Sequence, residues 1–196
     1  MSSENLDTRT RILEATARIL KLKGGRGVRM GDIAKETGIS RQAVYLHFPS
    51  RTDLLVETVK YTGDLLNVEA RLAPSRAATS GLERLRLYIE FWGNFLPEIY
   101  PFAKALMVAE DSDEAAAAAW QDRMVAMKDG CRAAIEALQA DGMLADGWTR
   151  PKAIEALWTL LLVPNWENLT QECGWSQKEY IRRMQLMAER MFVAGQ

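Results

Sequence analysis

The stretch MGDIAKETGISRQAVYLH, from Met30 to His47, has the pattern of two short helices joined by a tight turn. Counting Met30 as the first position, the small Ala34 stands fifth, Gly38 ninth and the branched Val44 fifteenth. A small residue lets two helices approach, a glycine takes the positive φ of the turn, and a branched apolar side chain fills the space beneath the second helix. Together these positions predict a helix-turn-helix that binds DNA.

The second of these helices is rich in side chains that carry hydrogen-bond donors. Ser40 precedes it and can cap it through the hydroxyl oxygen. Arg41 and Gln42 lie in the first turn and are the candidates for reading bases, because Arg can pair with guanine and Gln with adenine. Tyr45 and His47 are better suited to phosphate oxygens. The alternative is a solvated polar face on an ordinary helical hairpin.

The run from Leu6 to Leu55 closely resembles the DNA-binding domain of TetR/AcrR-type transcriptional regulators. Its most specific element is ISRQAVYLHFPSR, in which a Tyr, a His, a Phe and a basic residue follow one another as in that family. The resemblance implies a set of DNA-facing residues, to which we add Arg29, just before the motif, because its side chain could reach a phosphate. The set is Arg29, Ser40, Arg41, Gln42, Ala43, Tyr45, Leu46, His47 and Arg51.

Two positions depart from the family pattern. Arg29 stands where the family commonly caps its second helix with Ser or Thr, and Gly31 stands where a basic residue is common. The backbone contact to DNA at this point is therefore left open, although Arg29 could itself reach a phosphate.

The net charge of −1 is unevenly distributed along the chain. Residues 1 to 60 hold 11 Lys and Arg against 7 Asp and Glu, whereas the remaining residues hold 14 against 19. The segment with the motif is thus the basic one, as attachment to phosphate requires.

Long segments with helical apolar periodicity, and few that alternate with period two, predict an all-α protein. We expect an N-terminal three-helix helix-turn-helix DNA-binding domain over 1–51, with the helix-turn-helix at about 29–48, and a C-terminal helical ligand-binding and dimerisation domain over 52–196. Helices are expected at about 7–23, 52–71, 80–96, 101–110, 113–140, 151–172 and 176–194, with a break at Pro97, a connection at 73–80 and a bend at Pro164. The helix over 52–71 is the expected mechanical link between the domains.

Fourteen of the sixteen Trp, Tyr and Phe residues lie after residue 60. Bulky apolar groups from several helices can line a pocket for an apolar or aromatic small molecule, or they can simply fill a core. Composition leaves both open, and the family resemblance is what implies a cavity. The ligand-binding candidates are Tyr88, Phe91, Trp92, Phe95, Phe102, Met107, Trp120, Met124, Met127 and Trp158.

The last two expected helices have the character of an association surface. An apolar stripe repeats at intervals of four, three and four residues near the end of the chain, and the preceding segment is apolar nearly all round. In the family, the corresponding helices form a four-helix interface with a second copy. The residues predicted for a homodimer interface are Leu157, Leu161, Tyr180, Met184, Met187 and Met191. The alternative is a monomer that buries both helices in its own core.

We therefore expect a ligand-responsive transcriptional regulator, most simply a repressor that a hydrophobic small molecule releases from a palindromic double-stranded DNA operator. Neither a cofactor nor a metal is expected, because Cys131, Cys173 and the single His47 lack metal-ligand spacing. A cytoplasmic location is expected, because no run of about 18 apolar residues and no apolar secretion signal is found. The alternatives are an all-helical protein-interaction adaptor and a helical-bundle enzyme.

Overall fold

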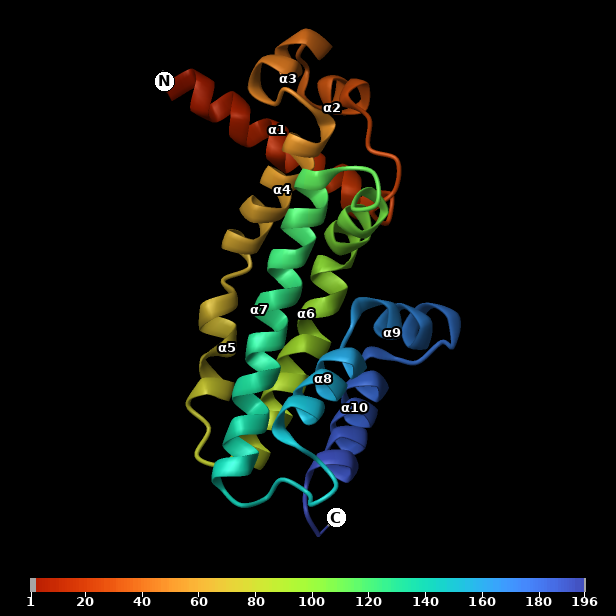
Figure 1. Ribbon diagram of the computed structural model, residues 1–196. Helices are drawn as coiled ribbons and strands as arrows, with labels where there is room; N and C mark the ends of the chain where they lie inside the picture. Colours follow the sequence, from red (N-terminus) through yellow and green to blue (C-terminus); the bar gives the residue numbers. More distant parts are fainter. Residues whose placement is uncertain (1–2, 196) are drawn as a thin grey trace. The chain divides into compact units, whose positions relative to one another are not determined.

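The computed structural model describes residues 3–195, which form ten α-helices, one π-helical turn and no strand (Figure 1). The α-helices are α1 (Ser3–Leu22), α2 (Met30–Thr37), α3 (Arg41–His47), α4 (Arg51–Leu65), α5 (Val68–Arg76), α6 (Gly81–Ala109), α7 (Glu114–Ala140), α8 (Arg150–Leu160), α9 (Val163–Glu167) and α10 (Gln177–Phe192), and the π-helical turn η1 is Asn168–Glu172. The all-α prediction is confirmed. None of the described helices is both long enough and apolar enough to cross a membrane.

Packing divides the chain into two compact units. The N-terminal unit comprises the residues up to Asn67 together with Ile99–Asp122, and the C-terminal unit comprises Val68–Glu98 with the residues from Arg123 onward. Helices α6 and α7 therefore each contribute to both units. These units differ in extent from the domains over 1–51 and 52–196, which remain a prediction about function.

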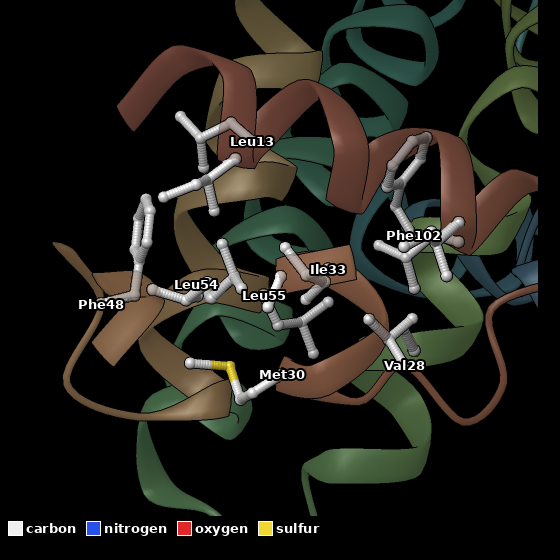
Figure 2. Packing of buried hydrophobic residues seen from close by; sticks show 14 of the residues in the cluster. Leu13, Val28, Met30, Ile33, Phe48, Leu54, Leu55 and Phe102 are labelled. Carbon is white, nitrogen blue, oxygen red and sulfur yellow. The ribbon is translucent and has the colours of Figure 1, made fainter. Parts of the chain in front are cut away.

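The N-terminal unit is held together by apolar side chains from six helices, α1 to α4, α6 and α7. Helix α1 packs against α2 and α4, and α2 packs against α3. Figure 2 shows Leu13 of α1, Ile33 of α2, Leu54 and Leu55 of α4 and Phe102 of α6 turned toward one core. All five side chains are buried, so α6 is as much a part of this core as the motif helices are.

The turn after α1 requires glycine for two reasons. Gly25 has a φ of 79°, in the left-handed region that other residues rarely adopt. A Cβ atom on Gly25 would lie 2.3 Å from the backbone oxygen of Pro101. The absent side chain thus lets the α1 end lie directly against α6.

The prediction of a single helix over 52–71 was wrong. Ser50 and Asp53 form a reciprocal capping box that starts α4, but the helix ends at Leu65 and α5 begins only at Val68. Asn67 between them has a φ of 46°, which an α-helix cannot continue and which Asn tolerates better than most residues. The expected mechanical link is therefore two helices with a turn between them. The connection predicted at 73–80 was partly wrong, since α5 extends to residue 76.

The break predicted at Pro97 was also wrong, because α6 continues through it. A proline inside a helix leaves the carbonyl four residues earlier, here that of Gly93, without its usual donor. The side-chain amide of Gln177 in α10 donates to this carbonyl, and its oxygen accepts from the indole of Trp166 at 3.0 Å. A distant helix thus replaces the hydrogen bond that Pro97 removes.

The bend predicted at Pro164 was partly wrong, because the helix ends before this residue instead of bending at it. Helix α8 ends at Leu160, and Pro164 is the second residue of the short α9, where a missing N–H costs no helical hydrogen bond. The segment expected as one helix over 151–172 therefore consists of α8, α9 and the π-helical turn.

Candidate nucleic-acid interface

The turn between α2 and α3 has the geometry that the motif predicts. Gly38 ends α2 with a φ of 71°, and its N–H donates to the carbonyls of Ala34 and Lys35. The hydroxyl oxygen of Ser40 accepts from the N–H of Ala43 at 3.1 Å and so caps α3. Val44, on the inward face of α3, is fully buried. These interactions fix where α3 begins and which of its faces points away from the core.

The side chains predicted to face DNA lie mostly on that outward face. Ser40, Arg41, Gln42, Tyr45 and Leu46 are exposed, and so are Arg29 and Arg51 on the flanking segments. Ala43 and His47 are half-buried. All nine residues belong to the N-terminal unit. They lie on α3 and its cap, just before α2, and at the start of α4. Arg29 precedes α2 without a side-chain cap, since a guanidinium has no acceptor for the helix N–H groups, and its charge helps to lower the pKa of the Asp32 carboxyl.

Arg41 and Tyr45 contact each other one turn apart on α3. A guanidinium nitrogen of Arg41 donates to the hydroxyl of Tyr45 at 3.3 Å, and the guanidinium carbon lies 5.6 Å from the centre of the ring. This contact restricts the rotamers of Arg41 before any ligand arrives, and that lowers the entropy cost of placing its donors.

The sequence analysis missed Arg9, which contacts residues that are far from it along the chain. From α1 it donates to the backbone oxygen of His47 at 2.8 Å and to the carboxylate of Glu57 in α4 at 3.2 Å. Its guanidinium also lies 4.3 Å from the centre of the Phe48 ring. A cation at a helix C-terminus is favourable, and here it joins the end of α3 to α1 and α4.

Other basic residues of α1 and of the turn that follows it contact α2. Arg11 donates to the backbone oxygen of Thr37 at 2.8 Å, Arg18 pairs with Glu36 at 3.4 Å, and Lys23 pairs with Asp32 at 2.7 Å. The hydrogen bond from Lys23 lowers the pKa of the Asp32 carboxyl, against a smaller opposing effect of desolvation. Part of the positive charge counted over residues 1–60 is therefore used inside the unit.

The geometry agrees with comparisons of the sequence. Residues 12–58 match the family model of bacterial regulatory proteins of the tetR family. The N-terminal part of this chain is therefore similar to the regulatory proteins of the tetR family. The match covers the second half of α1, the helix-turn-helix and the first half of α4, which are the elements that build the outward face.

Curated relatives extend the likeness to different degrees. Nucleoid occlusion factor SlmA of Marinomonas sp. (strain MWYL1) is 33% identical over 66 residues, which are 34% of this chain and 34% of that protein. The HTH-type transcriptional regulator CymR of Pseudomonas putida is 27% identical over 158 residues, 79% of this chain and 74% of CymR. The chain thus spans about a third of the length of the first relative and most of the second.

Solved structures show the same fold over nearly the whole chain. A protein from Saccharomonospora viridis, crystallised in complex with choline, superposes with a TM-score of 0.79 at 23% identity and covers 95% of this chain and 98% of that one. A TetR-family transcriptional regulator from Agrobacterium tumefaciens gives a TM-score of 0.74 at 20% identity, with 96% and 99% covered.

The residues predicted to bind ligand fall in both units of the chain. Phe102, Met107 and Trp120 belong to the N-terminal unit, and Phe102 is one of its core residues. The C-terminal unit holds Tyr88, Phe91, Trp92, Phe95, Met124, Met127 and Trp158.

Four of these aromatic rings form a continuous stripe on α6. Tyr88, Phe91, Trp92 and Phe95 contact one another with ring centres 5.1 to 6.3 Å apart. Burial raises the pKa of the Tyr88 hydroxyl well above its usual value, and this hydroxyl donates to the backbone oxygen of Met127 at 2.7 Å. The indole N–H of Trp158, in contrast, is buried without a hydrogen-bond partner.

The prediction of the dimer interface needs correction. Leu157, Leu161, Tyr180 and Met184 are at most 1% exposed within the chain, so they are core residues of the C-terminal unit and have no surface left for a second copy. Met187 is half-buried and Met191 is 36% exposed. The apolar periodicity of α10 therefore reports mainly on internal packing.

The cysteines differ in environment. Burial raises the pKa of the Cys131 thiol to about 12, so it stays protonated at neutral pH and is a poor nucleophile. Cys173 is exposed. Among the side chains that the structure describes, those of residues 7–195, no three His, Cys, Asp or Glu gather in a group that could hold a metal ion.

We predict that Arg9→Met loosens α3 while the N-terminal unit stays folded. Hydrogen bonds to charged groups are worth about 1.5 to 3 kcal/mol, so the amide protons of α3 should exchange about 10- to 150-fold faster. Hydrogen exchange followed by mass spectrometry on peptides over 41–48 measures this. Arg18→Met is the matched control, because the ion pair of Arg18 with Glu36 is exposed and joins α1 to α2 rather than to α3. Equal exchange in the two variants would contradict a positioning role for Arg9.

Proposed function

We propose that this protein is a DNA-binding transcriptional regulator that acts as a repressor and is released from its operator by an apolar small molecule. The observation that carries the proposal is the exposed, donor-rich face of α3 opposite the buried Val44. The match of residues 12–58 to the tetR family model and the curated relative named as an HTH-type transcriptional regulator support it.

A homodimer on a palindromic operator fits this interface. Two copies of α3 must lie about 34 to 36 Å apart to enter successive major grooves, which is one turn of DNA. A ligand that binds better to a conformation with another separation lowers the affinity for DNA by linkage. Helix α6 is suited to carry the effect, because Phe102 lies in the N-terminal core while the aromatic stripe belongs to the C-terminal unit.

A neutral ligand with an acceptor oxygen suits the C-terminal unit best. The similar fold from Saccharomonospora viridis was crystallised with choline, a cation. Here the ammonium of Lys128 lies 5.2 Å from the centre of the Trp158 ring, and the guanidinium of Arg71 lies 5.1 Å from that of Phe95. Cations therefore already cover two aromatic faces, which disfavours a cationic ligand. The unpartnered indole N–H of Trp158 favours an acceptor.

Binding to DNA is tested with duplexes selected from a random library by the purified full chain. Arg41→Ala and Gln42→Ala should each cost about 1 to 3 kcal/mol on the selected duplex and relax its base preference, because both side chains lie in the first turn of α3. Arg51→Ala should weaken selected and scrambled duplexes nearly equally, as expected of a phosphate contact. Fluorescence anisotropy on both duplexes separates the two effects. Unchanged selectivity in both α3 variants would refute base reading by these residues.

We expect the dimer interface to include the residues of α10 that are not buried within the chain. Met187→Glu combined with Met191→Glu should dissociate it, because the new carboxylates would be buried against each other across the interface. Light scattering measures the mass, and Val125→Glu is the control, since Val125 is 49% exposed on α7. A dimer that survives the double substitution would place the interface elsewhere.

Ligand release is tested on the operator complex with a panel of neutral aromatic compounds, in pairs that differ by a carbonyl oxygen. The carbonyl member should release DNA at a lower concentration. Trp158→Phe keeps an aromatic ring but removes the donor, and it should raise the concentration needed for half release about 2- to 13-fold, the value of one neutral hydrogen bond. Trp175→Phe, elsewhere in the same unit, should have no such effect. If no compound releases the DNA, the regulator is not controlled by this class of ligand.

A further inference from the structure

Leu46 is the most exposed large apolar side chain of the described residues, at 87%. A single exposed leucine is ordinary on a protein surface, and Leu22 at the end of α1 is 86% exposed. The position of Leu46 on α3 is what distinguishes it, because its neighbours on the outward face carry hydrogen-bond donors.

The helical period places Leu46 at the centre of that face. Successive residues are rotated by about 100° around an α-helix. Measured from the inward direction of Val44, Gln42 and Leu46 lie about 160° to either side, so together they straddle the line that points straight away from the core. Arg41 and Tyr45 lie on one flank and contact each other. The side chains that reach deepest into a groove are therefore one amide and one apolar group.

We propose that Leu46 packs against the C5 methyl group of a thymine in the major groove. This inference rests on the proposed DNA binding and names the base that the interface reads. The thymine methyl is the apolar feature of the major-groove pattern, and the amide of Gln42 can pair with N6 and N7 of adenine. Because Gln42 and Leu46 are about 6 Å apart along the helix axis and one base pair rises about 3.4 Å, the two side chains contact A·T pairs that lie within about two steps of each other.

The test changes only the methyl group. Duplexes selected by the full chain are synthesised with each thymine replaced in turn by deoxyuridine, which keeps the pairing with adenine and lacks the methyl. For the natural chain, one thymine in each half-site should show about fourfold weaker binding on replacement, the fold-change that corresponds to burying one such carbon. Anisotropy titrations at fixed salt give the ratio of the two dissociation constants.

Variants of two equally exposed leucines assign the effect to a residue. Leu46→Ala should bind the thymine and deoxyuridine duplexes equally, and Leu46→Val should give an intermediate ratio. Leu22→Ala should keep the fourfold ratio, because Leu22 lies outside α3. A circular dichroism spectrum equal to that of the natural chain should accompany each variant.

The outcomes separate this inference from the proposed function. If the natural chain selects a duplex but no thymine is sensitive to replacement, or if Leu46→Ala keeps the fourfold ratio, Leu46 does not read a methyl group while DNA binding stands. If the natural chain retains no duplex at all, both the inference and the proposed function are overturned.

Discussion

Helix α3 is only seven residues long, and a helix of this length is not stable by itself in water. Its existence and its orientation depend on burial of Val44 and Phe48, which are 0% and 1% exposed. The cap from Ser40 fixes its beginning, and the guanidinium of Arg9 holds its last carbonyl. This attachment to the core determines which side chains of α3 face outward.

The attachment also separates the residues that fold the N-terminal unit from those that can meet DNA. Arg9, Arg11 and Arg18 are basic, yet each contacts a backbone oxygen or a carboxylate inside the unit. Net charge along the sequence therefore overstates what is available to phosphates. The outward side chains of α3, such as Gln42, make little contribution to the core, so they can vary with the operator while the fold is kept.

Local signals were sufficient for the helix-turn-helix, since Gly38 and Val44 act through the turn and the core directly beside them. Other features depend on distant partners that no local pattern contains. Pro97 is tolerated because Gln177 satisfies the freed carbonyl, and Arg9 acts across 38 residues. The apolar periodicity likewise predicts that Met184 is buried, but it does not show whether the same chain or a second copy buries it. In the structure, Met184 lies in the core of its own chain.

The central claim is that α3 enters the major groove of operator DNA. Dimethyl sulfate footprinting tests it directly, because the reagent methylates N7 of guanine in the major groove and N3 of adenine in the minor groove. On a duplex selected by the full chain, the account predicts protection of guanine N7 in two patches about one helical turn apart, with adenine N3 left reactive between them. Protection confined to adenine N3, or the absence of any protected patch on a duplex that is bound, would contradict it.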